Sequence, residues 1–118
     1  MSRRTTAAEY KSLFVQDEGD IQRGILVALG DLGICAWRQN SGTARGGKIK
    51  LAPAGTPDII GWLPVSGRML AIEVKKPGEE PAPHQLEWLH RARASGVACT
   101  WVRSVREAVA FVRAELVR

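Results

Sequence analysis

The chain has 118 residues, of which 45% are hydrophobic and 25% charged, the proportions of an ordinary globular protein of one domain. No apolar run approaches the roughly 20 residues of a membrane span, and the first residues lack the apolar core of a signal peptide. Seventeen Lys and Arg against twelve Asp and Glu give a net charge of +5, and most of these cations are arginine. Arginine suits phosphate groups, so this balance favours a nucleic-acid partner, although it also simply keeps a small protein in solution.

The first half of the chain predicts a helix, a strand and a basic loop. A helix is expected over 17–29, with Asp17 as N-cap and Gly30 as the stop, and a short strand over 34–37. From Leu32 to Pro57 there is no acidic residue, and several glycines favour a flexible loop. Such a loop could bind the phosphate backbone of DNA, or it could be an ordinary surface loop exposed to water.

The second half predicts a hairpin followed by alternating helices and a strand. Strands are expected over 58–62 and 69–75, with turn residues between them. The remaining elements are a helix from Pro83 to about Ser95, a strand over 97–101 and a last helix from Ser104. The order α-β-β-β-α-β-α predicts an α/β fold in which helices pack on a mixed sheet.

Two acidic residues stand where apolar patterning makes them unusual. Glu18 shares a helical stripe with Ile21, Ile25 and Leu29, although a carboxylate at a helix start can simply stabilise the first turn. Strand alternation places Glu73 and Lys75 on one face, opposite an apolar face, where they form either a site or an ordinary solvent-side ion pair.

A third carboxylate is brought to the same place by the hairpin. If Val65 and Ser66 form its tip, paired residue numbers sum to 131, and Asp58 lies opposite Glu73 with Cβ atoms about 5 Å apart. Two like charges at that distance need a cation between them. Lys75 is one candidate, and a divalent metal is the better one because hard cations take clustered carboxylate oxygens.

These residues resemble a known family. Glu18, Pro57-Asp58 and Glu73-Val74-Lys75 look like the PD-(D/E)xK nuclease signature. With the segments 37–42 and 55–61 and with Gln85, the whole order resembles the VRR-NUC (virus-type replication-repair nuclease) domain over about Asp17 to Val112. The resemblance implies a restriction-endonuclease-like fold and hydrolysis of phosphodiester bonds that depends on Mg²⁺ or Mn²⁺.

The resemblance also implies a role for each matched residue. Asp58, Glu73 and Glu18 would bind the metal with the Val74 carbonyl, and Lys75 would orient or deprotonate the attacking water. Gln85 is expected at the same site, because its spacing from Leu89 and Ala92 also turns it inward. For DNA binding we expect the basic loop and its surroundings to supply Arg38, Asn40, Arg45, Lys48, Lys50 and Lys76.

The expected organisation is a single domain over 1–118, with a helical or partly ordered lead-in at 1–16. Stand-alone members of the family resemble junction resolvases that pair two sites in a homodimer. We therefore expect an endonuclease of the cytoplasm of a bacterial or phage-infected cell, acting in DNA repair on branched DNA such as Holliday junctions. No membrane and no nucleotide cofactor are expected.

Three other functions remain open at this stage. A metal-free nucleic-acid-binding module would use the same basic loop without the carboxylates, and in a protein-interaction domain the acid-free stretch would be accidental. A sequence-specific restriction-type enzyme is a further alternative, but a chain of 118 residues has little length for a recognition domain, which favours reading of DNA shape.

The cysteines and tryptophans are expected to be structural. Cys35 and Cys99 fit small buried thiols. The core is the favoured place for all the tryptophans, of which the first is the only one considered for DNA: Trp37, Trp62, Trp88 and Trp101.

Overall fold

The computed structural model describes residues 17–39, 43–44, 49–50 and 52–118, with the backbone alone at 43–44 and 49–50. The elements are α2 (Glu18–Asp31), β1 (Cys35–Arg38), β2 (Thr43–Ala44), β3 (Ile49–Lys50), β4 (Ile59–Trp62), β5 (Met69–Val74), α3 (Pro83–Ala94), β6 (Ala98–Val102) and α4 (Val105–Leu116). They confirm the α/β class and the order of the main elements. The basic loop differs, since it contains the small antiparallel pair β2–β3. The lead-in at 1–16 lies outside the described residues.

The main sheet has the strand order β1-β4-β5-β6. β4 runs antiparallel to both β1 and β5, whereas β5 and β6 are parallel and are joined through α3. Ile59 pairs with Ile72 and Ile60 with Ala71, so paired numbers sum to 131 and the predicted hairpin register is confirmed. Val65 turns the chain at the tip with a φ of 71°, which is unusual for a β-branched residue.

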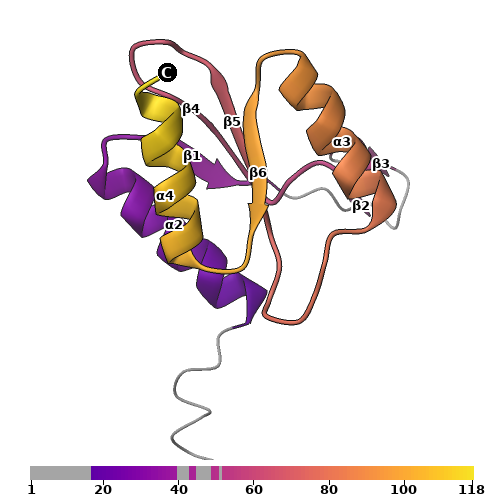
Figure 1. Ribbon diagram of the computed structural model, residues 1–118. Helices are drawn as coiled ribbons and strands as arrows, with labels where there is room; N and C mark the ends of the chain where they lie inside the picture. Colours follow the sequence, from indigo (N-terminus) through magenta and orange to yellow (C-terminus); the bar gives the residue numbers. More distant parts are fainter. Residues whose placement is uncertain (1–16, 40–42, 45–48, 51) are drawn as a thin grey trace, which may run out of the picture.

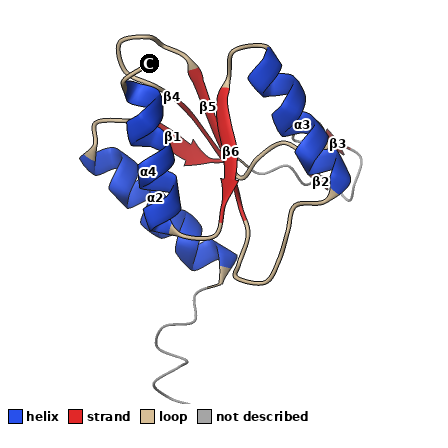
Figure 2. Cartoon of the chain, viewed as in Figure 1, coloured by secondary structure: helices blue, strands red, loops and turns tan. Residues whose placement is uncertain are grey.

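Helices lie on both faces of this sheet (Figures 1 and 2). α2 and α4 cover one face, where they form the larger core with apolar residues of the main sheet. Its central residues are fully buried: Ile25, Leu29, Ile59, Leu70, Ile72, Val74 and Val112. On the other face α3 covers a smaller cluster built on Ala71, Leu89 and Cys99. The two faces of the sheet therefore differ in how completely they are covered.

The helix boundaries follow the expected capping chemistry, with one exception. The side chain of Asp17 accepts a hydrogen bond from the Asp20 N–H at 2.7 Å, and Ser104 caps α4 in the same way. The predicted stop of the first helix at Gly30 is wrong, because α2 continues to Asp31. The left-handed residue that ends the turn is Gly33, with a φ of 78°.

Gly24 lies in the middle of α2 for a packing reason. A Cβ atom at this position would lie 2.7 Å from Cγ2 of Val105 at the start of α4. Because a real Cβ contact is never that short, the glycine allows the two helices to approach each other. The cost of glycine in a helix, about 1 kcal/mol relative to alanine, is accepted here for close packing.

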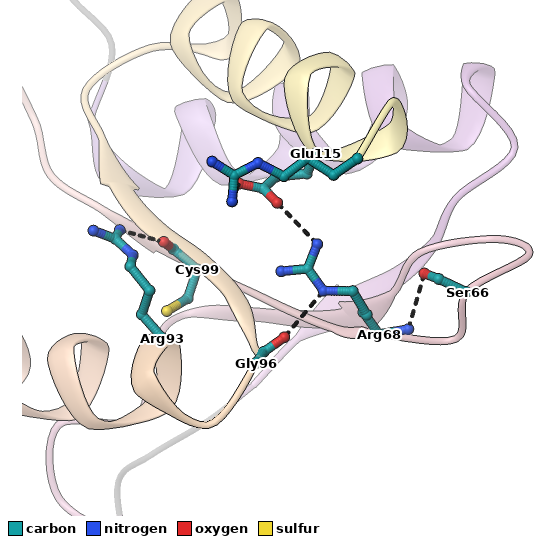
Figure 3. Close-up of polar contacts among 7 residues, drawn as sticks. Ser66, Arg68, Arg93, Gly96, Cys99 and Glu115 are labelled. Carbon is teal, nitrogen blue, oxygen red and sulfur yellow. Dashed lines mark hydrogen bonds and ion pairs between the residues drawn. The ribbon is translucent and has the colours of Figure 1, made fainter.

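Arg68 ties the start of β5 to two distant segments (Figure 3). Its Nε donates to the Gly96 carbonyl at 3.0 Å, and its guanidinium meets the mostly buried Glu115 carboxylate of α4, also at 3.0 Å. The hairpin, the turn before β6 and the last helix are thereby held together at the end of the sheet opposite Glu73 and Lys75.

Three of the expected core positions are wrong. Cys99 is buried as predicted, but Cys35 is exposed. Trp88 and Trp101 pack against the smaller cluster, whereas Trp37 and Trp62 are 43% and 46% exposed. The reason is that β1 is an edge strand and α3 packs mainly on β6, which leaves the β1–β4 part of this face uncovered.

Candidate active site

Asp58 is fixed between β1 and β5 by its own backbone and side chain. Its carbonyl accepts a hydrogen bond from the Gln39 N–H at 2.6 Å, which extends the β1–β4 ladder by one step. Its Oδ2 accepts from the Val74 N–H at 2.9 Å. Continuing the register by one residue places Asp58 opposite Glu73, as the sequence predicts.

Glu73 is a buried carboxylate with incomplete hydrogen bonding. The residue is only 2% exposed, because β5 lies between β4 and β6 and α3 covers this side. Its Oε1 lies 3.3 Å from Nε2 of Gln85 and 3.7 Å from Nζ of Lys75. Its Oε2 is buried and accepts no hydrogen bond from the described residues. A buried oxygen of this kind costs free energy unless a further positive or protonated group reaches it.

The pKa of Glu73 reflects its burial and its incomplete hydrogen bonding. Burial raises its pKa to about 8, and the adjacent Asp58 contributes to the rise through a hydrogen bond and through its negative charge. Lys75 acts in the opposite direction. Without a metal ion the pair therefore favours a proton on Glu73 at neutral pH.

Lys75 lies at the end of β5, on the same side as Glu73. Its N–H donates to the Val102 carbonyl at 2.9 Å, which extends the parallel ladder and fixes the backbone. The side chain is only 15% exposed, so its ammonium group is directed to the carboxylates and not into bulk solvent. The predicted Glu73–Lys75 face is confirmed, but it is a half-covered site and not a solvent-side ion pair.

Gln85 joins α3 to the site through its side-chain amide. Its Oε1 accepts a hydrogen bond from the Ala82 N–H at 2.8 Å, a helix-start arrangement that leaves Nε2 free to donate. Nε2 then donates to Oε1 of Glu73. The amide orientation is determined by these two partners, and Gln85 is placed at the site as expected.

Glu18 approaches from the first turn of α2, but it is engaged with a residue that the sequence did not indicate. Partial burial and a hydrogen bond with the Glu79 carboxyl group raise its pKa, and the charge of Asp58 adds to the rise. The same hydrogen bond lowers the pKa of Glu79. Glu79 lies in the loop after β5, where the turn from Lys76 brings it back toward α2. The Lys-Pro-Gly-Glu turn was the only signal for it in the sequence.

The described residues fit a divalent metal site with few protein ligands. Two carboxylates, Asp58 and Glu73, lie together, and Oε2 of Glu73 has no other partner. No group of three or more His, Cys, Asp or Glu side chains in the described parts of the chain is arranged to hold a metal ion. One or two carboxylates are nevertheless the usual protein share of a Mg²⁺ site, since water and substrate phosphate supply the other ligands.

The residues predicted to bind DNA are only partly described. Arg38 is exposed and pairs with Ile59, which places it on the α2 side of the sheet. Lys76 is exposed, and its Nζ lies 3.3 Å from Oε1 of Glu79. Asn40, Arg45 and Lys48 lie outside the described residues, as does the side chain of Lys50. None of the described helices is long and apolar enough to span a membrane.

A mixed sheet between helices, with two carboxylates and a lysine at the ends of neighbouring strands, defines a protein of the nuclease type. The VRR-NUC domain model matches residues 15–106, so the chain belongs to the VRR-NUC domain family. Four solved chains match, one of them described as a VRR_NUC domain. That structure covers 81% of this chain and 94% of its own length, with a TM-score of 0.61 and 28% sequence identity. Among curated proteins, none matches this chain.

The raised pKa of Glu73 predicts how the stability of the metal-free protein depends on pH. Between the ordinary value of 4.5 and about 8 the folded protein holds a proton that the unfolded chain has released. The stabilisation is therefore complete below pH 4.5 and is lost as the pH rises through 8. Thermal melts in EDTA at pH 6 and 8.5 should show a fall in Tm of roughly 5 °C or more for the wild type.

Glu73→Gln should remove most of this fall, because the amide does not ionise. Glu87→Gln, at an exposed position of α3, is the matched control and should keep the wild-type slope. The assignment fails if Glu73→Gln and the wild type lose the same Tm over this range.

Proposed function

We propose that this chain is a divalent-metal-dependent endonuclease that hydrolyses phosphodiester bonds in DNA, with branched DNA such as Holliday junctions as its substrate. The observation that carries the proposal is the buried Oε2 of Glu73, which accepts no hydrogen bond from the described residues and lies beside a second carboxylate. Membership of a nuclease-like family supports the same reaction class. A purely structural role does not explain why a sheet would bury one carboxylate directly beside another.

Asp58 and Glu73 would hold Mg²⁺ or Mn²⁺ together with the Val74 carbonyl, and Glu18 is the remaining candidate ligand. When bound, the ion supplies Lewis-acid stabilisation of the charge that develops on the phosphate. The chain fixes the two carboxylates independently of the ion. Asp58 is held by the Val74 N–H, and Glu73 is held by Gln85.

Lys75 would orient or deprotonate the water that attacks the phosphate. Its ammonium group is held at 3.7 Å from Oε1 of Glu73 and is largely screened from solvent. A cation in that place also attracts the phosphate group to be cleaved. Gln85 acts as a positioning residue, because its amide touches Glu73 and not the reacting atoms.

The proposed DNA contacts come from the basic loop and from Arg38, Asn40, Arg45, Lys48, Lys50 and Lys76. The net charge of +5 favours the approach of a polyanion. One such site cuts one strand, so the proposal includes a homodimer that pairs two sites on a symmetric junction. The proposed setting is the cytoplasm of a bacterial or phage-infected cell.

The direct experiment is to incubate the purified protein with a four-way junction, a flap and a linear duplex, each in Mg²⁺, Mn²⁺ or EDTA. Cleavage of the branched substrates that requires a divalent ion supports the proposal. Binding of DNA without cleavage in either ion would leave a metal-free nucleic-acid-binding module as the function.

Lys75→Ala should reduce cleavage by at least about a hundredfold, because it removes the group that handles the attacking water. The far-ultraviolet circular dichroism and the affinity for DNA should stay close to the wild type. Arg106→Ala, which removes an exposed cation on α4, is the control for a general loss of positive charge. Unchanged turnover in Lys75→Ala would eliminate its proposed role.

Asp58→Asn tests the metal site through stability and does not depend on activity. The amide oxygen can still accept the Val74 N–H, but one of two carboxylates that repel each other when both are ionised is lost. At pH 8.5, above the pKa of Glu73, the metal-free variant should therefore melt a few degrees above the metal-free wild type. Titration with Mn²⁺ should raise the Tm of the wild type by mass action and should raise that of Asp58→Asn much less. If the wild type is indifferent to Mn²⁺ up to millimolar concentrations and the variant is the less stable of the two, the carboxylates do not form a metal site.

A further inference from the structure

Two tryptophans on the neighbouring strands β1 and β4 are exposed to solvent. Trp37 on β1 and Trp62 on β4 are 43% and 46% exposed. Their rings meet edge to face, with centroids 6.0 Å apart and an interplanar angle of 66°. Exposing a tryptophan side chain to water is unfavourable. In this pair the cost is offset only by the contact between the two rings and by the burial of part of each ring.

The pair lies on the same side of the sheet as the candidate active site. Trp37 pairs with Ile60, and Trp62 follows Ile60 by two residues on the same face. Asp58 precedes Ile60 by two residues, so it lies diagonally across from Trp37, with Cα atoms about 7–8 Å apart. The exposed indoles and the carboxylates therefore belong to one continuous surface.

An open groove lies on this same side, beside α3. It has a volume of about 520 Å³ and runs between α3 and the turn at Pro53 and Ala54. Trp88, which packs against the smaller cluster as Ile60 does, forms part of its wall, and Arg91 and Glu87 are charged groups on it. The α3 side of the sheet thus carries the exposed tryptophans, the two carboxylates and a groove with a cation on its wall.

We propose that Trp37 and Trp62 form a stacking surface for unpaired nucleotides of the DNA substrate. The proposal rests on the proposed nuclease function and specifies which feature of the substrate is recognised. An indole face stacks on any base, but a base inside a continuous duplex is already stacked and does not present its face. The pair would therefore distinguish DNA with unpaired nucleotides, such as a fork or an open junction, from uninterrupted duplex.

The size of the surface favours a base over a second copy of the chain. Two half-exposed indoles offer roughly 200–250 Å² together. A stable protein–protein interface needs about 800 Å² on each partner. A surface of a few hundred Å² matches one or two nucleobases, and it is joined to the carboxylates that would act on the neighbouring phosphate.

The test compares two DNA probes of equal length in EDTA, a fork with unpaired arms and a fully paired duplex, by fluorescence anisotropy. Trp37→Ala and Trp62→Ala should each weaken binding of the fork about fivefold or more, and binding of the duplex less than twofold. Trp62→Phe, which keeps an aromatic face, should retain most of the affinity for the fork. Val27→Ala is the matched control, because Val27 is an exposed apolar residue of α2 on the other side of the sheet.

A second readout does not depend on truncation. An unlabelled single strand should quench the tryptophan fluorescence of the wild type, and the double variant Trp37→Phe/Trp62→Phe should lose most of the quenching while still binding. The remaining Trp88 and Trp101 report whether other tryptophans contribute. Thermal melts of each variant identify any that fails to fold.

Three results would overturn the proposal. The alanine variants bind both probes as the wild type does, they lose affinity for both probes equally, or the wild type is a dimer that they convert to monomers. If the wild type cleaves DNA with a metal and the alanine variants distinguish the fork from the duplex as the wild type does, only the stacking surface is refuted. If the tryptophans govern binding of the fork but no metal supports cleavage, the stacking surface stands and the nuclease function is refuted.

Discussion

The pairing of β4 with β5 decides where every group of the candidate site lies. A shift of one residue in this antiparallel register would turn Glu73 toward α2 and α4 and would expose Ile72 to the other side. The same register aligns Asp58 with the Val74 N–H, which holds one carboxylate next to the other. Burying a carboxylate beside a second one is unfavourable by itself, and the pKa of Glu73 is raised mainly by its burial and further by Asp58.

The register tolerates this cost because the opposite face of the same strands is strongly apolar. Ile59, Ile72 and Val74 are fully buried against α2 and α4, and a slip would remove them all from the core at once. At the far end of the hairpin, Arg68 fastens β5 to the turn before β6 and to α4. The unfavourable charges are thus carried by strands whose position is determined by other contacts.

The sequence contained enough information to predict the register and most of the site, because short-range rules govern them. The hairpin tip fixed the sum of 131, and helix spacing turned Gln85 inward. Burial of Trp62 and Cys35 was mispredicted, because residue type gives an average tendency and the extent of coverage by α3 is a tertiary property. Glu79 was missed for the same reason, since only the fold brings its loop back to Glu18.

The unequal covering of the two faces connects stability to function. One face is fully sealed by α2 and α4 and supplies the larger core. Among the described residues, α3 is the helix on the other face, where it covers β5 and β6 and leaves much of β1 and β4 open. Because side chains alternate along a strand, each residue that strengthens the sealed face has neighbours on the open one, where Asp58 and Trp62 lie. A single short strand such as β4 therefore contributes to the core on one side and presents groups to a ligand on the other. The open face can carry residues that lower stability, such as exposed tryptophans and adjacent carboxylates, without loss of the fold.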